Sequence, residues 1–106
     1  MTKTAIKNLA ELGQSVWIDN ISRDMFDSGR LHQMLKEGLL GMTSNPSIFE
    51  KSISGSNQYD KQIAALAGQG KSTFEIYDSL STKDVQEALD AFLPIYKDTS
   101  KLDGYV

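Results

Sequence analysis

Gly41-Met42-Thr43-Ser44-Asn45-Pro46-Ser47-Ile48-Phe49 is the most informative segment of this 106-residue chain, and Val16-Trp17-Ile18-Asp19-Asn20 is its counterpart upstream. In each segment a short apolar run ends in polar residues. Such runs, bounded by glycine and polar residues, predict strands over residues 15–19 and 39–43. Polar side chains at the ends of neighbouring strands can face a common pocket.

Helices are predicted before and between these strands. Apolar residues recur at helical spacing over residues 3–12, and again between Ser28, which can cap a helix, and Gly38, which can end one. The first strand has the apolar character of a strand buried on both faces. Trp17, which lies inside that strand, is therefore expected to pack against a covering helix.

The region after the second strand is predicted to be mainly helical. Asn45 followed by Pro46 suits a helix N-cap with proline at the first helical position, and a turn over residues 54–57 should end that helix. Further helices are expected over residues 59–67, 74–80 and 81–93. Pro94 should kink or interrupt the last of them.

The order of elements indicates an α/β fold. Strands separated by helical crossovers run parallel, and parallel sheets are covered on both faces. Residues 98–103 predict a polar connection, and a third strand is expected to open at residues 104–106, where the sequence stops. An eight-stranded barrel takes about 250 residues. An open doubly wound sheet has the same early pattern, but no glycine-rich phosphate loop follows Asp19.

We therefore predict a partial (β/α)8 TIM barrel that comprises the first two to three βα units. Residues 1–106 are expected to form the N-terminal portion of a single barrel domain that is truncated at the start of the third strand. The barrel remainder, or self-association, would be needed to cover the sheet edge and the apolar helix faces.

Composition excludes several classes of protein. The net charge of −3 and the scattered Lys and Arg residues provide no basic surface for nucleic acid. With no cysteine and one histidine, the sequence predicts neither disulfides nor a Cys- or His-rich metal site. No apolar run is long enough for a membrane span, and the N-terminus lacks the apolar core of a secretion signal, so a cytoplasmic location is expected.

Asp19, Thr43, Ser44 and Asn45 supply the polar groups at the ends of the two strands. In parallel α/β barrels the carboxyl ends of the strands carry the functional residues, so these groups can converge on one ligand. A partly desolvated carboxylate exchanges protons with a substrate hydroxyl, and an Asn amide beside it both donates and accepts hydrogen bonds, which suits a polyhydroxylated substrate. Structural roles stay open: Asp19 can bond backbone amides before Ser22, and Asn45 can simply cap a helix.

The two segments, extended to Asp24 and Lys51, closely resemble the N-terminal region of transaldolases. The resemblance covers nearly the whole chain and is closest to the branch that includes fusions with phosphoglucose isomerase. Transaldolases are (β/α)8 barrels that transfer a dihydroxyacetone unit between sugar phosphates of the pentose phosphate pathway. They need no metal or organic cofactor, because a lysine forms a Schiff base with the ketose.

The resemblance implies roles for three residues of this chain. Asp19 matches the first-strand carboxylate that acts as acid/base on the sugar hydroxyl. Asn45 matches the asparagine that holds a hydroxyl of the dihydroxyacetone unit, and Thr43 matches the threonine that lines the pocket. The family's third-strand glutamate, Schiff-base lysine and phosphate-binding residues have no counterpart here, so this chain alone is expected to be inactive.

Other ionisable residues are expected to have ordinary roles. His32 should lie at the surface, and Arg23 and Asp24 should cap a helix or face solvent. The lysines are expected to be solvated: Lys51, Lys61, Lys71, Lys83, Lys97 and Lys101. Two alternatives to a transaldolase remain, namely another Schiff-base sugar-phosphate aldolase barrel and a noncatalytic assembly or binding module.

Overall fold

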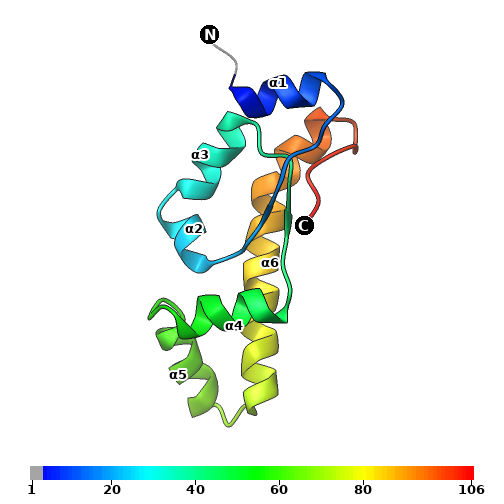
Figure 1. Cartoon of the computed structure of the whole chain (residues 1–106). Helices are drawn as coiled ribbons and strands as arrows, with labels where there is room; N and C mark the ends of the chain where they lie inside the picture. The colour runs from blue at the N-terminus through cyan, green and yellow to red at the C-terminus, as the bar shows by residue number, and fades with distance from the viewer. Residues whose placement is uncertain (1–3) are drawn as a thin grey trace.

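The computed structural model describes residues 4–106, which form six helices and a pair of strands (Figure 1). The molecule is elongated, with extents of 50 × 23 × 21 Å. The elements in chain order are α1 (Ala5–Glu11), β1 (Trp17–Asp19), α2 (Arg23–Asp27), α3 (Arg30–Glu37), β2 (Gly41–Thr43), α4 (Pro46–Ser54), α5 (Asp60–Gly68) and α6 (Thr73–Asp98).

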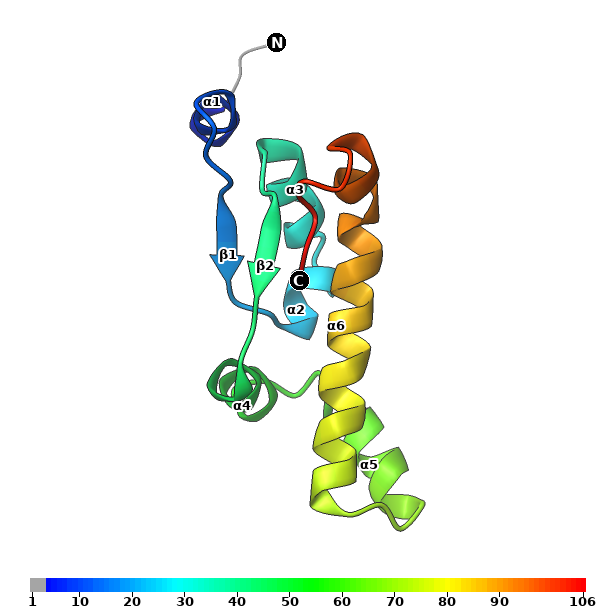
Figure 2. The same cartoon turned by 90° about the vertical axis from the view of Figure 1, so that its right-hand side faces the viewer.

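The strands β1 and β2 are parallel neighbours, which confirms the predicted α/β pattern. Figure 2 shows them side by side, with α2, α3 and α6 on one side of the pair. The predicted third strand begins beside β2: Tyr105 forms a parallel bridge with Gly41, and its carbonyl accepts from the Met42 amide at 3.0 Å. This short parallel sheet is compatible with part of a (β/α)8 barrel.

The helices cover one face of the strand pair. Met42 is fully buried and Ile18 packs against the core beside it. Because side chains alternate along a strand, Trp17, Asp19 and Thr43 lie on the opposite face, which we call the open face. Trp17 is 41% exposed there. Among residues 4–106, β1 is therefore buried on one face only, contrary to the prediction, and Trp17 does not lie beneath the helices that cover the sheet.

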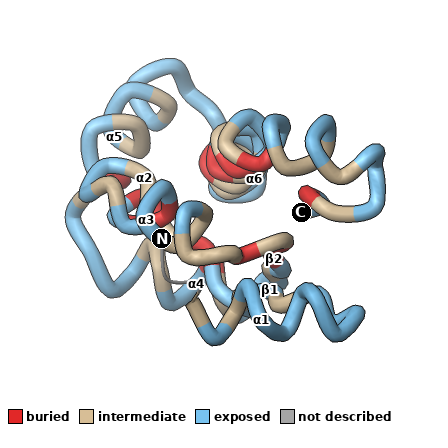
Figure 3. Tube along the Cα trace, turned by 90° about the horizontal axis from the view of Figure 1, so that it is seen from above, coloured by how far each residue is buried: buried red, intermediate tan, exposed pale blue. Residues whose placement is uncertain are grey.

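The hydrophobic core lies between β2 and the helices α2, α3, α4 and α6. Figure 3 shows the buried segments, in red, on α6 and on the chain that faces it, whereas α1 is tan or pale blue. Burying each large apolar side chain contributes about 1.5–3 kcal/mol. The members of this core are Ile21, Met25, Leu31, Leu39, Met42, Phe49, Ala88 and Phe92.

Most predicted helix ends agree with the structure. The helix α3 ends at Gly38, and α4 begins at Pro46 and ends before Gly55. The helices over residues 5–11 and 60–68 are present, whereas α2 was not predicted. Residue 3, which the first predicted helix included, lies outside the described residues. None of the helices formed by residues 4–106 combines the length and apolar character needed to cross a membrane.

The helix α6 runs for 26 residues where two shorter helices were predicted. Ser72 and Glu75 form a capping box at its start. Ser81, where a new helix was predicted to begin, lies inside α6 and donates its hydroxyl to the Tyr77 carbonyl at 2.9 Å. Ser and Thr residues inside a helix commonly satisfy their hydroxyls in this way. The helix also continues past Pro94 to Asp98, so the predicted interruption is wrong.

Arg23 and Asp84 form a buried ion pair, which corrects the prediction that Arg23 caps a helix or faces solvent. Arg23 Nε lies 3.0 Å from Asp84 Oδ1, and the two residues are 7% and 0% exposed. The Tyr59 hydroxyl donates to the other Asp84 carboxylate oxygen and accepts from the Arg23 amide. The Arg23 guanidinium lies 4.1 Å from the centroid of the Tyr59 ring. We call these residues the buried Arg23 cluster.

Burial and the hydrogen bond to Asp84 raise the pKa of Tyr59 well above its ordinary value of 10.0. The neutral Tyr59 phenol therefore makes its full contribution to the free energy of unfolding below about pH 10. This contribution is lost as the pH rises towards the folded-state pKa. We expect the free energy of unfolding, measured by urea denaturation with circular dichroism, to fall more steeply above about pH 10 in the wild type than in Tyr59→Phe.

The matched control is Tyr105→Phe, because Tyr105 is 44% exposed. This variant keeps the hydrogen bond between Tyr59 and Asp84, so it should retain the steep fall above about pH 10. A Tyr59→Phe variant whose stability falls in parallel with the wild type above about pH 10 would contradict the expected linkage.

Candidate functional site

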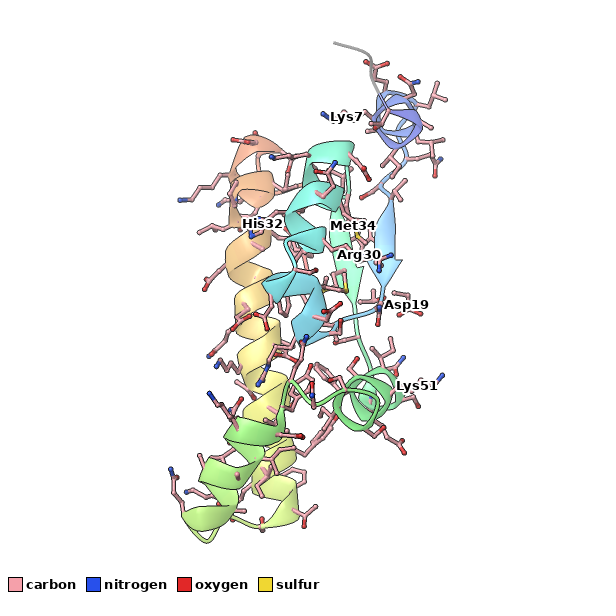
Figure 4. The ribbon with its side chains drawn as sticks, turned by 90° about the vertical axis from the view of Figure 1, so that its left-hand side faces the viewer. Lys7, Asp19, Arg30, His32, Met34 and Lys51 are labelled. Carbon is pink, nitrogen blue, oxygen red and sulfur yellow. The ribbon has the colours of Figure 1, made fainter. Side chains whose placement is uncertain are left out.

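The site predicted from the sequence lies at the carboxyl ends of the two strands. Asp19 is the last residue of β1, and Thr43, the last residue of β2, is its partner in the parallel register. Figure 4 shows Asp19 at the end of β1 nearest α4. Both side chains belong to the open face and are exposed. The strand pairing thus brings two of the three predicted site residues together.

A hydrogen bond joins these two residues directly. Thr43 Oγ1 donates to Asp19 Oδ1 at 2.7 Å. Hydrogen bonds to a carboxylate are stronger than those between neutral groups, so the bond orients the Asp19 side chain. An ionised carboxylate has about four acceptor positions, and a single hydroxyl leaves most of them available for a ligand. The partner of Asp19 is thus a side chain of the neighbouring strand, not a backbone amide of the turn before Ser22.

Asn45 has the structural role that the sequence left open. Its Oδ1 accepts from the Ile48 amide at 2.9 Å, and Pro46 follows at the first helical position of α4. The predicted cap is confirmed. Capping uses only the side-chain oxygen, whereas Nδ2 carries two donors that a ligand hydroxyl could use. A binding role for Asn45 therefore stays a prediction.

Asn45 also borders a cavity of about 310 Å³ between the start of α4 and the first half of α6. Asp19 and Thr43 do not line this cavity. Asn45 therefore follows Thr43 by two residues, but it borders a cavity that the Asp19–Thr43 pair does not line. The residues that line the cavity are Asn45, Pro46, Phe49, Tyr77, Ser81, Thr82, Val85 and Gln86.

His32 and the six lysines expected to be solvated lie at the surface, as predicted. His32 is exposed on α3, and Figure 4 shows it away from the end of β1 that carries Asp19. The six lysines expected to be solvated are all exposed, including Lys51 on α4. Within residues 4–106, no group of three or more His, Cys, Asp or Glu side chains is arranged to hold a metal ion.

Trp17 is the residue of this face that sequence reasoning placed wrongly. It precedes Asp19 by two positions in β1 and faces Gly41, two positions before Thr43 in β2. The period of two along a strand is the signal that puts Trp17 and Asp19 on one face. The apolar run alone does not show which face the helices leave open.

Comparisons with known proteins identify similar sequences that contain the paired strands and the Asp19–Thr43 pair. The family described as transaldolase/fructose-6-phosphate aldolase matches residues 16–106. The transaldolase of Trichodesmium erythraeum is 47% identical over 107 residues, and the match spans 100% of this chain and 28% of that protein. Transaldolase 2 of a Nostoc species is 45% identical, spanning 96% of this chain and 28% of that protein. The transaldolase of Neisseria gonorrhoeae is 40% identical, spanning 97% and 29% respectively.

The family match includes β1, β2 and the whole of α6, together with the Asp19–Thr43 pair. It confirms the resemblance seen in the sequence. The chain spans less than a third of the length of these curated relatives. This chain belongs to the transaldolase/fructose-6-phosphate aldolase family.

Proposed function

We propose that this chain is the N-terminal portion of a transaldolase, which transfers a dihydroxyacetone unit between sugar phosphates of the pentose phosphate pathway. Family membership supports the reaction class. The observation that carries the proposal is the hydrogen bond from Thr43 to Asp19 at the ends of paired parallel strands. It provides an oriented carboxylate where barrel enzymes place their chemistry.

In the proposed reaction a lysine forms a Schiff base with the ketose carbonyl, so that no separate cofactor is required. Asp19 accepts the proton of the sugar hydroxyl as the carbon–carbon bond breaks and returns it when the new bond forms. Thr43 holds the carboxylate in place, and the Asn45 amide donates to a hydroxyl of the bound three-carbon unit. The resemblance to transaldolases implies that the Schiff-base lysine lies on the fourth strand of the barrel, outside these 106 residues.

The proposed architecture is the first two to three βα units of a (β/α)8 barrel. The open face of β1 and β2 would face the barrel interior. Leu89, Leu93, Tyr96 and Tyr105 line a mainly apolar cavity of about 280 Å³ beside the start of the third strand. We infer that the rest of the barrel covers this cavity and the open face. Self-association of a noncatalytic module is the alternative, and the absence of transaldolase activity in the complete protein would favour it.

Asp19→Asn tests the acid/base role in the complete enzyme. The substitution keeps the size of the side chain but removes its basicity, so kcat should fall by about 10²–10⁴-fold. Steady-state kinetics measure the loss, and circular dichroism checks that the fold survives. A folded Asp19→Asn enzyme with a kcat near that of the wild type would assign Asp19 a structural role only.

Variants of Asn45 separate its capping role from ligand binding. Asn45→Asp keeps an oxygen for the Ile48 amide, so stability should be retained, whereas the lost amide donors should lower kcat/KM by the equivalent of about 1–3 kcal/mol. Asn45→Ala should also lower the free energy of unfolding by about 0.5–2 kcal/mol. Urea denaturation and steady-state kinetics measure the two effects. If kcat/KM is unchanged in Asn45→Asp, the residue acts as a cap alone.

Borohydride trapping tests where the Schiff-base lysine lies. The isolated chain, incubated with fructose 6-phosphate and borohydride, should show no substrate adduct by intact mass, because the lysines among residues 4–106 are exposed rather than desolvated. The complete transaldolase of Trichodesmium erythraeum serves as the positive control and should be trapped. An adduct on any lysine of the isolated chain would place the nucleophile within these residues.

A further inference from the structure

The open face carries an aromatic ring two residues before the candidate carboxylate in β1. Trp17 pairs with Gly41, and Asp19 pairs with Thr43. Two residues along a strand span roughly 6.6 Å, so the indole lies one layer towards the amino ends of the strands. Trp17 is 41% exposed, which shows that the described helices do not cover it.

The absence of a side chain at Gly41 is what admits this ring. A Cβ built on Gly41 would lie 2.3 Å from both Trp17 Cδ2 and Trp17 Cε2, far inside van der Waals contact. These two atoms form the bond shared by the rings of the indole, so Trp17 presents the face of its ring to the Gly41 backbone. Glycine is required here because the backbone and the ring approach closely.

Hydrogen bonds also hold the indole through its ring nitrogen. Trp17 Nε1 donates to Ser15 Oγ at 2.8 Å, and Ser15 Oγ donates to Asp103 Oδ1 at 2.6 Å. Ser15 precedes β1, and Asp103 precedes the bridge that Tyr105 makes with β2. The indole is therefore held between a glycine and a chain of polar groups at the amino ends of the strands.

From this arrangement, and resting on the proposed function, we infer that Trp17 forms the floor of the sugar-phosphate site beneath Asp19. The ring closes the site at a fixed depth and keeps water from approaching the carboxylate from below. Gly41 sets where the ring lies. Trp17 thereby determines how well the three-carbon unit is bound, while Asp19 determines how fast it reacts.

The experiment uses the complete enzyme with Trp17→Ala, Trp17→Phe and Gly41→Ala. Removing the floor in Trp17→Ala should raise KM for fructose 6-phosphate about tenfold with a smaller change in kcat, because binding contacts are lost. Trp17→Phe keeps an aromatic floor and should stay within about threefold of the wild type. Gly41→Ala displaces the ring and should raise KM about as much as Trp17→Ala. If Trp17→Ala does not fold, Trp17→Leu makes the same comparison.

The double variant Trp17→Ala/Gly41→Ala tests whether the two residues act together. A methyl group at position 41 has no ring to displace once Trp17 is alanine, so KM in the double variant should equal that of Trp17→Ala alone. Phe74→Ala is the matched control, because Phe74 is an aromatic residue that is 74% exposed at the start of α6. This control should leave KM and kcat unchanged.

The outcomes separate this inference from the proposed function. If Asp19→Asn lowers kcat but Trp17→Ala leaves KM unchanged, the inferred role of Trp17 is rejected and the transaldolase assignment stands. Additive effects of the Trp17 and Gly41 substitutions on log KM would also overturn the inferred role of Trp17. A complete protein without transaldolase activity would instead reject the proposed function, and the substrate floor with it.

Discussion

The buried ion pair between Arg23 and Asp84 is the interaction on which the arrangement of this chain depends. Asp84 is fully buried, so its charge is tolerable only while Arg23 and Tyr59 supply hydrogen bonds to both carboxylate oxygens. Removing one partner of a buried pair typically costs about 3–5 kcal/mol, because the other charge is left uncompensated. The pair joins the start of α2 to the middle of α6. Tyr59, the residue before α5, contacts the same pair and so connects α5 to it.

This cluster also fixes the end of the strand that carries the candidate site. Arg23 follows Asp19 by four residues, and between them the Ile21 carbonyl accepts from the Ser52 hydroxyl of α4 at 2.6 Å. The backbone beyond Asp19 is therefore held by α4 and by α6 within one short segment. Asn45 caps the start of the same helix α4. One set of contacts thus positions both strand ends, although Asp19 itself lies on the open face.

Local signals in the sequence were sufficient to predict the two strands and the helix cap at Asn45, because each depends on residues that are close in the chain. The buried Arg23 cluster was not predictable in this way, since Arg23 and Asp84 are 61 residues apart and each resembles a surface charge by itself. The residues around Ser81 resemble a helix start, yet the hydroxyl bonds within α6 and the helix continues. Trp17 was misplaced because an apolar run does not reveal which face the helices cover.

Two carboxylates of this chain show how the fold separates stability from chemistry. Asp84 has both oxygens hydrogen-bonded by Arg23 and Tyr59 and is fully buried, so a ligand cannot reach it. Asp19 is exposed and oriented through one oxygen by Thr43. A group suited to proton transfer must be held in position yet keep acceptor positions free. On that criterion the buried carboxylate supports the fold, and the one at the end of β1 is available for catalysis.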